Sequence, residues 1–372
     1  MNLQRRVQEL FQQYQGAIVR LESMHIEPGE SDTDQPRVRV KDGTGFFISR
    51  EGLILAGASR VKGSRRVTVY HQGSQYLAEV IATDEQTNVA LLKALYLPDS
   101  FDFLRMNESP ALPDPGTFGL TITCPLKLSP TPRMTMIAGH ETKFDTKLFP
   151  TTFIRLDTPS FQGEVGGPII DLQGRLIGML FAGVPQIQSS YALPAGAINK
   201  IKDDLLLEGR ASYASVGIEI GQDFIRGNKT RVKILDVASG SPAAVAGIMT
   251  GDFVKKVGDY TISDFSDFPN AMFFIRVGEY VDMEIERDSK TIAFNLPTIR
   301  RPDEDRLVKI RPMTPEEVFE AMEEQQAELA PQTDISPEPE TSEVEAPSKD
   351  ETTPLSIPLS PEKETEGPTP QN

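Results

Sequence analysis

The sequence predicts a mainly β protein in three parts: a large β domain, a smaller α/β domain and an acidic, disordered tail. Three observations predict this class. From about residue 16 to residue 198, short runs rich in Val, Ile, Leu and Phe are separated by Gly, Pro and Asp, which is typical of a barrel or a sandwich. A second series of strands, mixed with helical stretches, lies between about residues 211 and 300. Near residue 313 the apolar runs stop.

Length and charge agree with two folded domains. The chain has 372 residues, of which 38% are hydrophobic and 25% charged, as in ordinary globular proteins. The net charge of -16 belongs mostly to the tail, because residues 313–372 carry 16 acidic and 2 basic residues and leave -2 for the rest. A nearly neutral body without a basic stripe excludes nucleic acid as an expected partner.

The first element is an amphipathic helix over residues 1–15. It is predicted because apolar side chains recur there at spacings of three and four: Leu3, Val7, Leu10, Phe11 and Tyr14. We expect this helix to dock on the body of the protein or on a neighbouring subunit. The β domain follows over residues 16–200, and the helix-like stretch AINKIKDDLLLEGR contains the expected linker, residues 201–210.

The second domain is expected over residues 211–300. Its strands are VGIEIG, TRVKILDV, FVKKVGDY, YVDMEIERD and TIAFNLP, with helical stretches at SPAAVAGI and around residues 264–275. Residues 301–330 are a linker and an acidic helix that begins at the Thr314 cap. Residues 331–372 are rich in Pro, Glu, Ser and Thr, too polar to offset the entropy of ordering.

The sequence does not decide the cellular compartment of the protein. The first residues lack the continuous apolar run of a signal peptide, and no segment has the 18 apolar residues that span a membrane. Taken literally, this start predicts a cytoplasmic protein, whereas a removed signal or a misassigned start predicts the cell envelope or periplasm. Cys124 is the one cysteine, so no intramolecular disulfide forms. We expect no metal and no cofactor, because neither has a motif here.

One segment carries a specific resemblance. LDTPSFQGEVGGPIIDLQGRLIGML, residues 156–180, resembles without a gap the nucleophile region of the HtrA/Deg serine proteases, which implies a trypsin-like double β-barrel for residues 16–200. The matching Gly163, Gly166 and Gly167 are the remnant of a turn that presents backbone N–H groups to an oxyanion. Alternatively, these glycines persist because a tight turn between barrel strands needs them.

The same resemblance implies a degenerate catalytic triad. Val165 stands at the position of the family's nucleophilic serine, and an isopropyl group cannot attack a carbonyl. GTGFFISREGLILAGASRV, residues 43–61, places Ser59 at the histidine position, and IATDEQTNVALLKA, residues 81–94, places Asn88 at the aspartate position. His25, His71 and His140 lie outside the matching motifs. Ser59 and Ser160 are hydroxyls near the former site, and each would need a base.

Residues 211–300 resemble the PDZ domains that follow HtrA-type protease domains. Ser215, Val216, Gly217 and Ile218 match the carboxylate-binding loop, and SGSPAAVAGIMTGDFVKKVGD, residues 239–259, matches a second motif. Such domains add a chain end to a sheet edge and bind its carboxylate through loop N–H groups. The resemblance therefore implies a peptide-binding role for these four residues, of which Val216 and Ile218 are alternatively ordinary strand core.

Three functions remain open. The first is a pseudoprotease that binds unfolded peptides or protein C-termini as a scaffold, a chaperone-like holder or a regulator of an active HtrA-type relative. The second is an active HtrA-type endopeptidase in protein quality control with a non-standard site. The third is an assembly component whose domains only mediate subunit contacts. The resemblance also implies homo-oligomers, trimers or larger, built through the protease-like domain.

Overall fold

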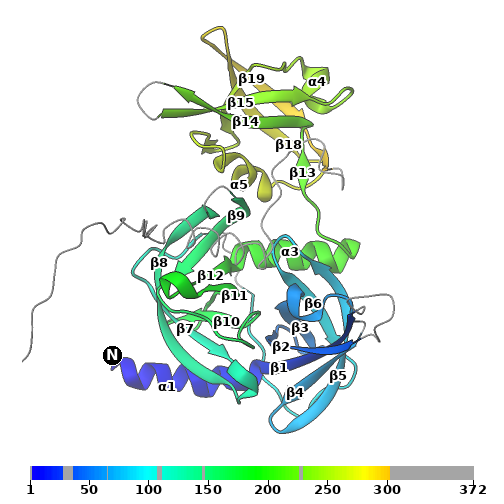
Figure 1. The fold of residues 1–372 in the computed structure, drawn as a ribbon, viewed down its shortest axis with the longest axis vertical. Helices are drawn as coiled ribbons and strands as arrows, with labels where there is room; N and C mark the ends of the chain where they lie inside the picture. The colour runs from blue at the N-terminus through cyan, green and yellow to red at the C-terminus, as the bar shows by residue number, and fades with distance from the viewer. Residues whose placement is uncertain are drawn as a thin grey trace, which may run out of the picture. The chain divides into compact units, whose positions relative to one another are not determined.

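The structure of the chain is a computed structural model that describes residues 2–27, 37–64, 66–106, 111–144, 147–225 and 229–301. The expected mainly β class, with a double barrel followed by a small α/β domain, is confirmed within these ranges (Figure 1). Except for Arg301, the acidic helix expected within residues 301–330 and the tail expected over residues 331–372 lie outside the described residues.

The first barrel is closed by six antiparallel strands in the order β1-β2-β3-β6-β5-β4. Its interior is filled by aliphatic and aromatic side chains such as Val19, Phe47 and Leu92, which are at most 1% exposed. The short helix α2 follows the third strand. The bounds of these elements are β1 Ile18–Glu27, β2 Arg37–Phe47, β3 Leu53–Gly57, α2 Ala58–Val61, β4 Arg66–His71, β5 Ser74–Asp84 and β6 Val89–Ala94.

The second barrel closes in the order β10-β11-β12-β9-β8-β7. β11 is buried along its whole length, which explains why its sequence reads as a continuous apolar run. The elements are β7 Phe118–Thr123, η2 Pro125–Lys127, β8 Thr131–Phe144, β9 Lys147–Leu156, β10 Pro168–Asp171, β11 Leu176–Val184, η3 Pro185–Ile187 and β12 Ser189–Pro194.

Two helices pack on the barrels. α1, Leu3–Tyr14, continues into η1, Gln15–Ala17, and is tied to the second barrel by hydrogen bonds from Arg6 Nε to the Leu172 carbonyl at 2.8 Å and from the Tyr14 hydroxyl to the Gly174 carbonyl at 2.9 Å. Of the two docking places expected for this helix, the structure shows the body of the protein. No helix among the described residues is both long and apolar enough to cross a membrane.

The helix α3, Ala195–Glu208, runs across position 200, where the sequence predicted a domain boundary. Its apolar face, including Ile198, Ile201 and Leu205, is fully buried in the same core as both barrels. Its buried Lys200 donates to Asp204 and to the Ser212 carbonyl. The helix is therefore part of the core of the first domain.

The second unit contains a six-stranded antiparallel sheet, in which β14-β15-β16-β18-β19 lie in that order and β17 pairs with β16, and a separate β13–β20 pair. Two helices complete it. The bounds are β13 Ala214–Ser215, β14 Ile218–Ile225, β15 Lys229–Val237, α4 Pro242–Ala246, β16 Phe253–Val257, β17 Tyr260–Thr261, α5 Asp267–Phe273, β18 Tyr280–Arg287, β19 Lys290–Pro297 and β20 Ile299–Arg300. The unit has its own hydrophobic core, which includes Val232, Met283 and Ile285.

Candidate functional site

The loop between β9 and β10 is anchored from inside by Glu164. This side chain is 1% exposed. One carboxylate oxygen accepts hydrogen bonds from Arg133 Nη2 and Thr123 Oγ1, each at 2.8 Å. The other accepts from the backbone N–H of Phe161 at 2.6 Å. The Arg133 guanidinium also lies 4.8 Å from the centroid of the Phe161 ring. A buried charge with this many partners holds the loop in one shape.

The glycines of this loop are required by close packing against the first barrel. Gly163 and Gly166 have φ angles of 89° and 91°, which favour glycine. A Cβ atom on Gly166 would lie 2.4 Å from the backbone nitrogen of Gly57 and 2.4 Å from the carbonyl oxygen of Thr44. The Thr44 hydroxyl also donates to the Gly163 carbonyl at 2.6 Å. A Cβ on Gly167 would lie 3.0 Å from the Glu164 carbonyl.

Some polar groups of the turn remain open. Among the described residues, the backbone N–H groups of Gly163 and Val165 have no hydrogen-bond acceptor, whereas the N–H of Gly166 donates to the Leu180 carbonyl at 2.9 Å. An unpaired N–H can donate to a ligand oxygen. The turn is therefore sterically determined and still keeps the donors from which an oxyanion site is made, so both interpretations of the glycines have a physical basis.

The structure brings Ser59, Asn88 and Val165 together where the two barrels meet. Asn88 Oδ1 accepts from the backbone N–H of Ser59 at 2.7 Å, and Asn88 Nδ2 donates to the Phe181 carbonyl at 3.2 Å. A Cβ atom on Gly57 would lie 2.8 Å from Val165 Cγ1 and 3.6 Å from Asn88 Nδ2. The three positions that the motifs align with a triad thus form one cluster.

Ser59 and the three histidines considered from the sequence have hydrogen-bond partners, and Ser160 lies against Gly183. Arg60 Nε donates to Ser59 Oγ at 3.2 Å, and the place of a Cβ on Gly183 is only 2.5 Å from Ser160 Oγ. The histidines each use Nε2 in a contact: His25 with Ser23 Oγ at 2.7 Å, His71 with the Gly16 carbonyl at 2.8 Å and His140 with the Pro113 carbonyl at 2.8 Å.

Cys124 lies beside the same turn but is not a replacement nucleophile. A Cβ on Gly163 would meet the Cys124 carbonyl at 2.7 Å, and the thiol residue is 1% exposed. Burial raises the pKa of Cys124 to about 12, against smaller lowering effects of Arg20 and Thr44. The attacking species of a cysteine is its thiolate, and at neutral pH this thiol stays protonated.

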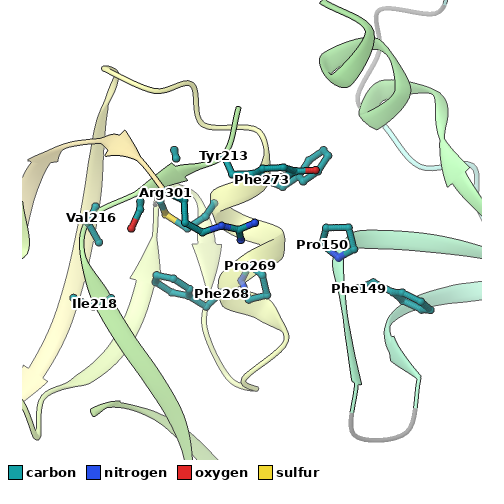
Figure 2. Close-up of a pocket in the computed structure, with 12 residues that line it drawn as sticks. Phe149, Pro150, Tyr213, Val216, Ile218, Phe268, Pro269, Phe273 and Arg301 are labelled. Carbon is teal, nitrogen blue, oxygen red and sulfur yellow. The ribbon is translucent and has the colours of Figure 1, made fainter. Parts of the chain in front are cut away.

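A second candidate site is an apolar pocket formed by residues of the second unit together with Phe149 and Pro150 of β9 (Figure 2). It lies between the β13–β14 segment and α5. Its lining is Phe149, Pro150, Tyr213, Ala214, Ser215, Val216, Ile218, Phe268, Pro269, Met272, Phe273 and Arg301. The cavity measures about 40 Å³, about three times the space that one water needs. Met272, with its flexible thioether, can adjust the wall of the pocket to a ligand.

The pocket opens beside a free sheet edge. β14 pairs with β15 and with no other strand of the described ranges. The outer N–H and C=O groups of an edge strand can pair with an added chain. Because Ile218 begins β14 and also lines the pocket, a strand added to this edge would bring one of its side chains toward the cavity.

The four predicted loop residues lie where this pocket ends. Ser215, Val216 and Ile218 line it. Gly217 has a φ of 83° and donates its N–H to Ser215 Oγ at 3.0 Å. Val216 and Ile218 are each 1% exposed and belong to the core of the unit. These two side chains are therefore core residues that also form a pocket wall, which joins the two alternatives left by the sequence.

Comparison with known proteins decides the family. Residues 43–179 match the trypsin-like peptidase domain, and residues 219–298 match the PDZ domain. The chain belongs to the HtrA/Deg family. It is 25% identical over 297 residues to a probable periplasmic serine endoprotease DegP-like of Marinomonas sp. (strain MWYL1), covering 75% of this chain and 61% of that relative. It is 26% identical over 283 residues to the putative serine protease HhoB of Synechocystis sp. (strain ATCC 27184 / PCC 6803 / Kazusa), covering 70% and 67%.

Solved structures show the same fold. The HtrA-type protease AlgW with decapeptide superposes with a TM-score of 0.64 at 18% identity, covering 80% of this chain and 99% of that one. The serine endoprotease from Yersinia pestis gives a TM-score of 0.57 at 20% identity, covering 80% and 98%. The HtrA/Deg chain spans about 61% of the length of the DegP-like relative.

Sequence reasoning missed half of the PDZ pocket. The α5 side of the pocket, formed by Phe268, Pro269 and Met272, has a weak signal in the apolar spacing of the helical stretch around residues 264–275. Arg301 follows the last strand, and nothing in the sequence indicated that it would line the pocket. Glu164 was also missed, because nothing in a turn motif tells a buried acidic residue from a solvated one.

Proposed function

We propose that this HtrA/Deg chain is a pseudoprotease that binds peptides or protein C-termini through its PDZ domain, as a scaffold, a chaperone-like holder or a regulator of an active relative. The observation that carries the proposal is Val165 at the nucleophile position. Its Cγ1 packs against Gly57, and it has no oxygen or sulfur with which to attack a carbonyl.

The neighbours of Val165 lead to the same proposal. Asn88 is a neutral amide, so it cannot stabilise an imidazolium as a carboxylate does. Ser59 has no imidazole that could act as a base. Its contact with Asn88 is made by its backbone N–H, which donates to Asn88 Oδ1 at 2.7 Å. With nucleophile, base and orienting acid all replaced, covalent acyl transfer has no starting group. The unpaired N–H groups of the turn are then left with a binding role at most.

The PDZ half supports the binding role. An open edge strand beside an apolar pocket is the arrangement that takes an extended chain end, and AlgW is described with a decapeptide. We propose that this chain binds peptides at the corresponding edge, along β14. Trimeric assembly through the protease-like domain is part of the same proposal, and light scattering of the full chain tests it.

The alternative is an active endopeptidase, which the names of the relatives favour. Cleavage of unfolded casein by the full chain separates the two. We expect no turnover by the wild type, by Val165→Ser, or by a Ser59→Ala/Ser160→Ala double variant. The exposed Ser129→Ala is the control for nonspecific effects. Turnover by wild type and by Ser129→Ala that disappears in the double variant would refute the pseudoprotease and indicate a rebuilt site.

A further inference from the structure

Asn88, at the position of the family's aspartate, uses both ends of its side-chain amide. Oδ1 accepts a hydrogen bond from the backbone N–H of Ser59 at 2.7 Å, and Nδ2 donates to the Phe181 carbonyl at 3.2 Å. These partners fix which end of the amide is which, because an N–H only donates and a carbonyl only accepts. Asn88 is 1% exposed. A carboxylate in its place could make the first contact but not the second.

On the first barrel, Asn88 caps the short helix α2. Gly57, the N-cap residue of α2, has no side chain that could accept from the first N–H groups of the helix. Asn88 accepts in its place, with its own carbonyl from the N–H of Ala58 at 3.0 Å and with its side chain from Ser59. Its φ of 56° lies in the left-handed region, which asparagine adopts more readily than most residues. Because the first N–H groups of a helix need acceptors, these contacts fix α2 to the turn that contains Asn88.

On the second barrel, Asn88 binds a carbonyl at an irregular point of the sheet. A β-bulge between Leu180 and Ala182 interrupts the pairing of β11 with β12 and leaves Phe181 without a partner in that ladder. Phe181 is 1% exposed, and the centroid of its ring lies 4.7 Å from that of Phe153. A buried carbonyl without a donor costs free energy. The amide nitrogen of Asn88 supplies a donor here.

The PDZ domain contacts the same turn through the residues that flank its short strands β13 and β20. The hydroxyl of Tyr213 donates to Asp84 Oδ2 at 2.7 Å, and this oxygen also accepts from the N–H of Thr87 at 2.9 Å. Burial and the charge of Asp84 raise the pKa of Tyr213 well above its usual value, so the hydroxyl stays a donor. Arg301 Nη2 donates to Gln86 Oε1 at 2.7 Å. The turn between β5 and β6 therefore contacts both barrels and the PDZ domain.

We propose that Asn88 is a positioning residue that joins the two barrels and the PDZ domain at the former active site, and that only an amide can make this junction. An aspartate would place one carboxylate oxygen against the Phe181 carbonyl with no hydrogen between them. The position at which the family carries its aspartate thus has a structural role of its own in this chain. The inference is independent of the proposed peptide binding.

The test is Asn88→Asp in the full chain. Urea unfolding of the variant and of the wild type is followed by circular dichroism at about pH 4.5 and about pH 8, on either side of the range in which a buried carboxyl group titrates. At about pH 8 the new carboxylate has no proton for the Phe181 carbonyl, and we expect the unfolding equilibrium constant to rise about tenfold or more.

The difference from the wild type is expected to shrink in acid. Burial favours the neutral acid, so the new carboxyl group has a higher pKa in the folded variant than the value of about 4 in an unfolded chain. The stability of the variant is then fully present below about pH 4 and is lost as the pH rises through the folded value. The protonated acid can donate to the Phe181 carbonyl as the amide does.

The ionisable groups around Asn88 are common to the wild type and the variant. They are Lys41 of β2 and Arg60 of α2, which both contact Ser59, and Asp84 and Glu85 of the turn. The strand β11 contributes no ionisable residue. The titration of these groups therefore cancels in the difference.

Two variants control the result. Asn270→Asp makes the same change in α5, where Oδ1 accepts from Thr151 Oγ1 and from the N–H and Oγ1 of Thr152, and where Nδ2 has no acceptor among the described residues. A carboxylate keeps these contacts, so we expect no loss of stability. Asn88→Ala removes both side-chain contacts, and we expect a loss that is the same at both pH values.

The outcomes are distinct. A loss for Asn88→Asp that is equal at both pH values indicates a packing effect and overturns the inference, as does a variant as stable as the wild type at about pH 8. A variant that folds only in acid supports the inference. A variant that folds at neither pH, while Asn88→Ala folds, overturns it.

Hydrogen exchange tests the part of the PDZ domain in the junction. Tyr213→Phe removes one hydroxyl, and we expect the Ser59 amide to exchange about tenfold faster because the turn that holds its acceptor opens more often. Tyr14→Phe is the control, since its hydroxyl binds the Gly174 carbonyl between α1 and the second barrel, and it leaves the Ser59 amide unchanged. An unchanged Ser59 amide in Tyr213→Phe would exclude the PDZ domain from the junction.

Discussion

The turn at Val165 and the groove beside α5 are both built around a charge in apolar surroundings, but the two charges differ in their partners. Glu164 is paired with Arg133 and two further donors. Arg301 has one neutral acceptor, Gln86, and donors to spare. A fully partnered buried charge fixes a shape, whereas a charge with unused hydrogen-bonding capacity beside a cavity can receive a ligand. The comparison assigns a structural role to the first charge, whereas the second keeps unused hydrogen-bond donors beside a cavity.

The largest expected effect removes the charge at the turn. Glu164→Ala leaves Arg133 without its partner and Thr123 without its acceptor, and we expect a loss of about 3–4 kcal/mol in the free energy of unfolding. Because the chain has no tryptophan, urea unfolding is followed by circular dichroism. Glu141→Ala is the control, since its pair with Arg155 is about one-third exposed and contributes less than about 1 kcal/mol. Equal losses would contradict a structural role for Glu164.

A second change sharpens the assignment of the turn to structure. Gly166→Ala forces a Cβ to within 2.4 Å of two backbone atoms, and we expect about 3 kcal/mol of destabilisation. Gly116→Ala has a similar φ, 89°, with nothing within 4 Å of the Cβ, and isolates the backbone strain at about 1 kcal/mol. Peptide affinity of the folded fraction stays at the wild-type level in both variants. A lower affinity only in Gly166→Ala would indicate that the turn takes part in binding.

The smallest expected effect concerns a paired charge within the PDZ domain. Arg287 binds both carboxylate oxygens of Asp252 at 2.6 Å, and the N–H of Met249 donates to Oδ2 at 2.8 Å. Burial alone would raise the pKa of Asp252, but these hydrogen bonds and the charge of Arg287 lower it below its usual value. The pair therefore stabilises the fold above the pKa of an unfolded aspartate, and this stabilisation is lost as the pH falls through the lowered value.

The measurement is the difference in the free energy of unfolding by urea between wild type and Asp252→Asn as a function of pH. We expect about 1–2 kcal/mol at neutral pH, constant down to about pH 5 and lost as the pH falls through the lowered pKa of Asp252. Asp223→Asn, whose partner Arg231 and own side chain are each about one-third exposed, changes this free energy by less than about 1 kcal/mol. A difference that grows on acidification would mean that the sign of the pKa shift is wrong.

Much of the fold was predictable because glycine-rich turns and alternating apolar runs are local signals. The double barrel was predicted from the sequence match around Gly163, Gly166 and Gly167. The structure places these glycines where a Cβ does not fit. The exception is the boundary at residue 200, which falls inside α3. A helix that connects two domains and a helix that fills a core can have the same composition. Which role α3 has therefore depends on contacts with residues far away in the sequence.

The candidate site was predictable only where one segment forms it. Ser215, Val216 and Ile218 are neighbours in sequence and in the pocket. Arg301 and Met272 reach the same pocket from segments far along the chain, and whether a charge meets a partner there depends on tertiary packing. The pairing of Glu164 with Arg133 is hidden for the same reason, since the two residues are 31 positions apart.

The unpaired edge of β14 also affects how the protein behaves at high concentration. Main-chain hydrogen bonds do not distinguish the end of a ligand from a strand of an unfolded neighbour, so an empty edge is a place where copies can begin to polymerise. The charged pair of Asp223 and Arg231, at the far end of the β14–β15 hairpin, opposes flat stacking there. A chain end bound as proposed would cover the remaining edge, so ligand binding would also protect the protein against aggregation.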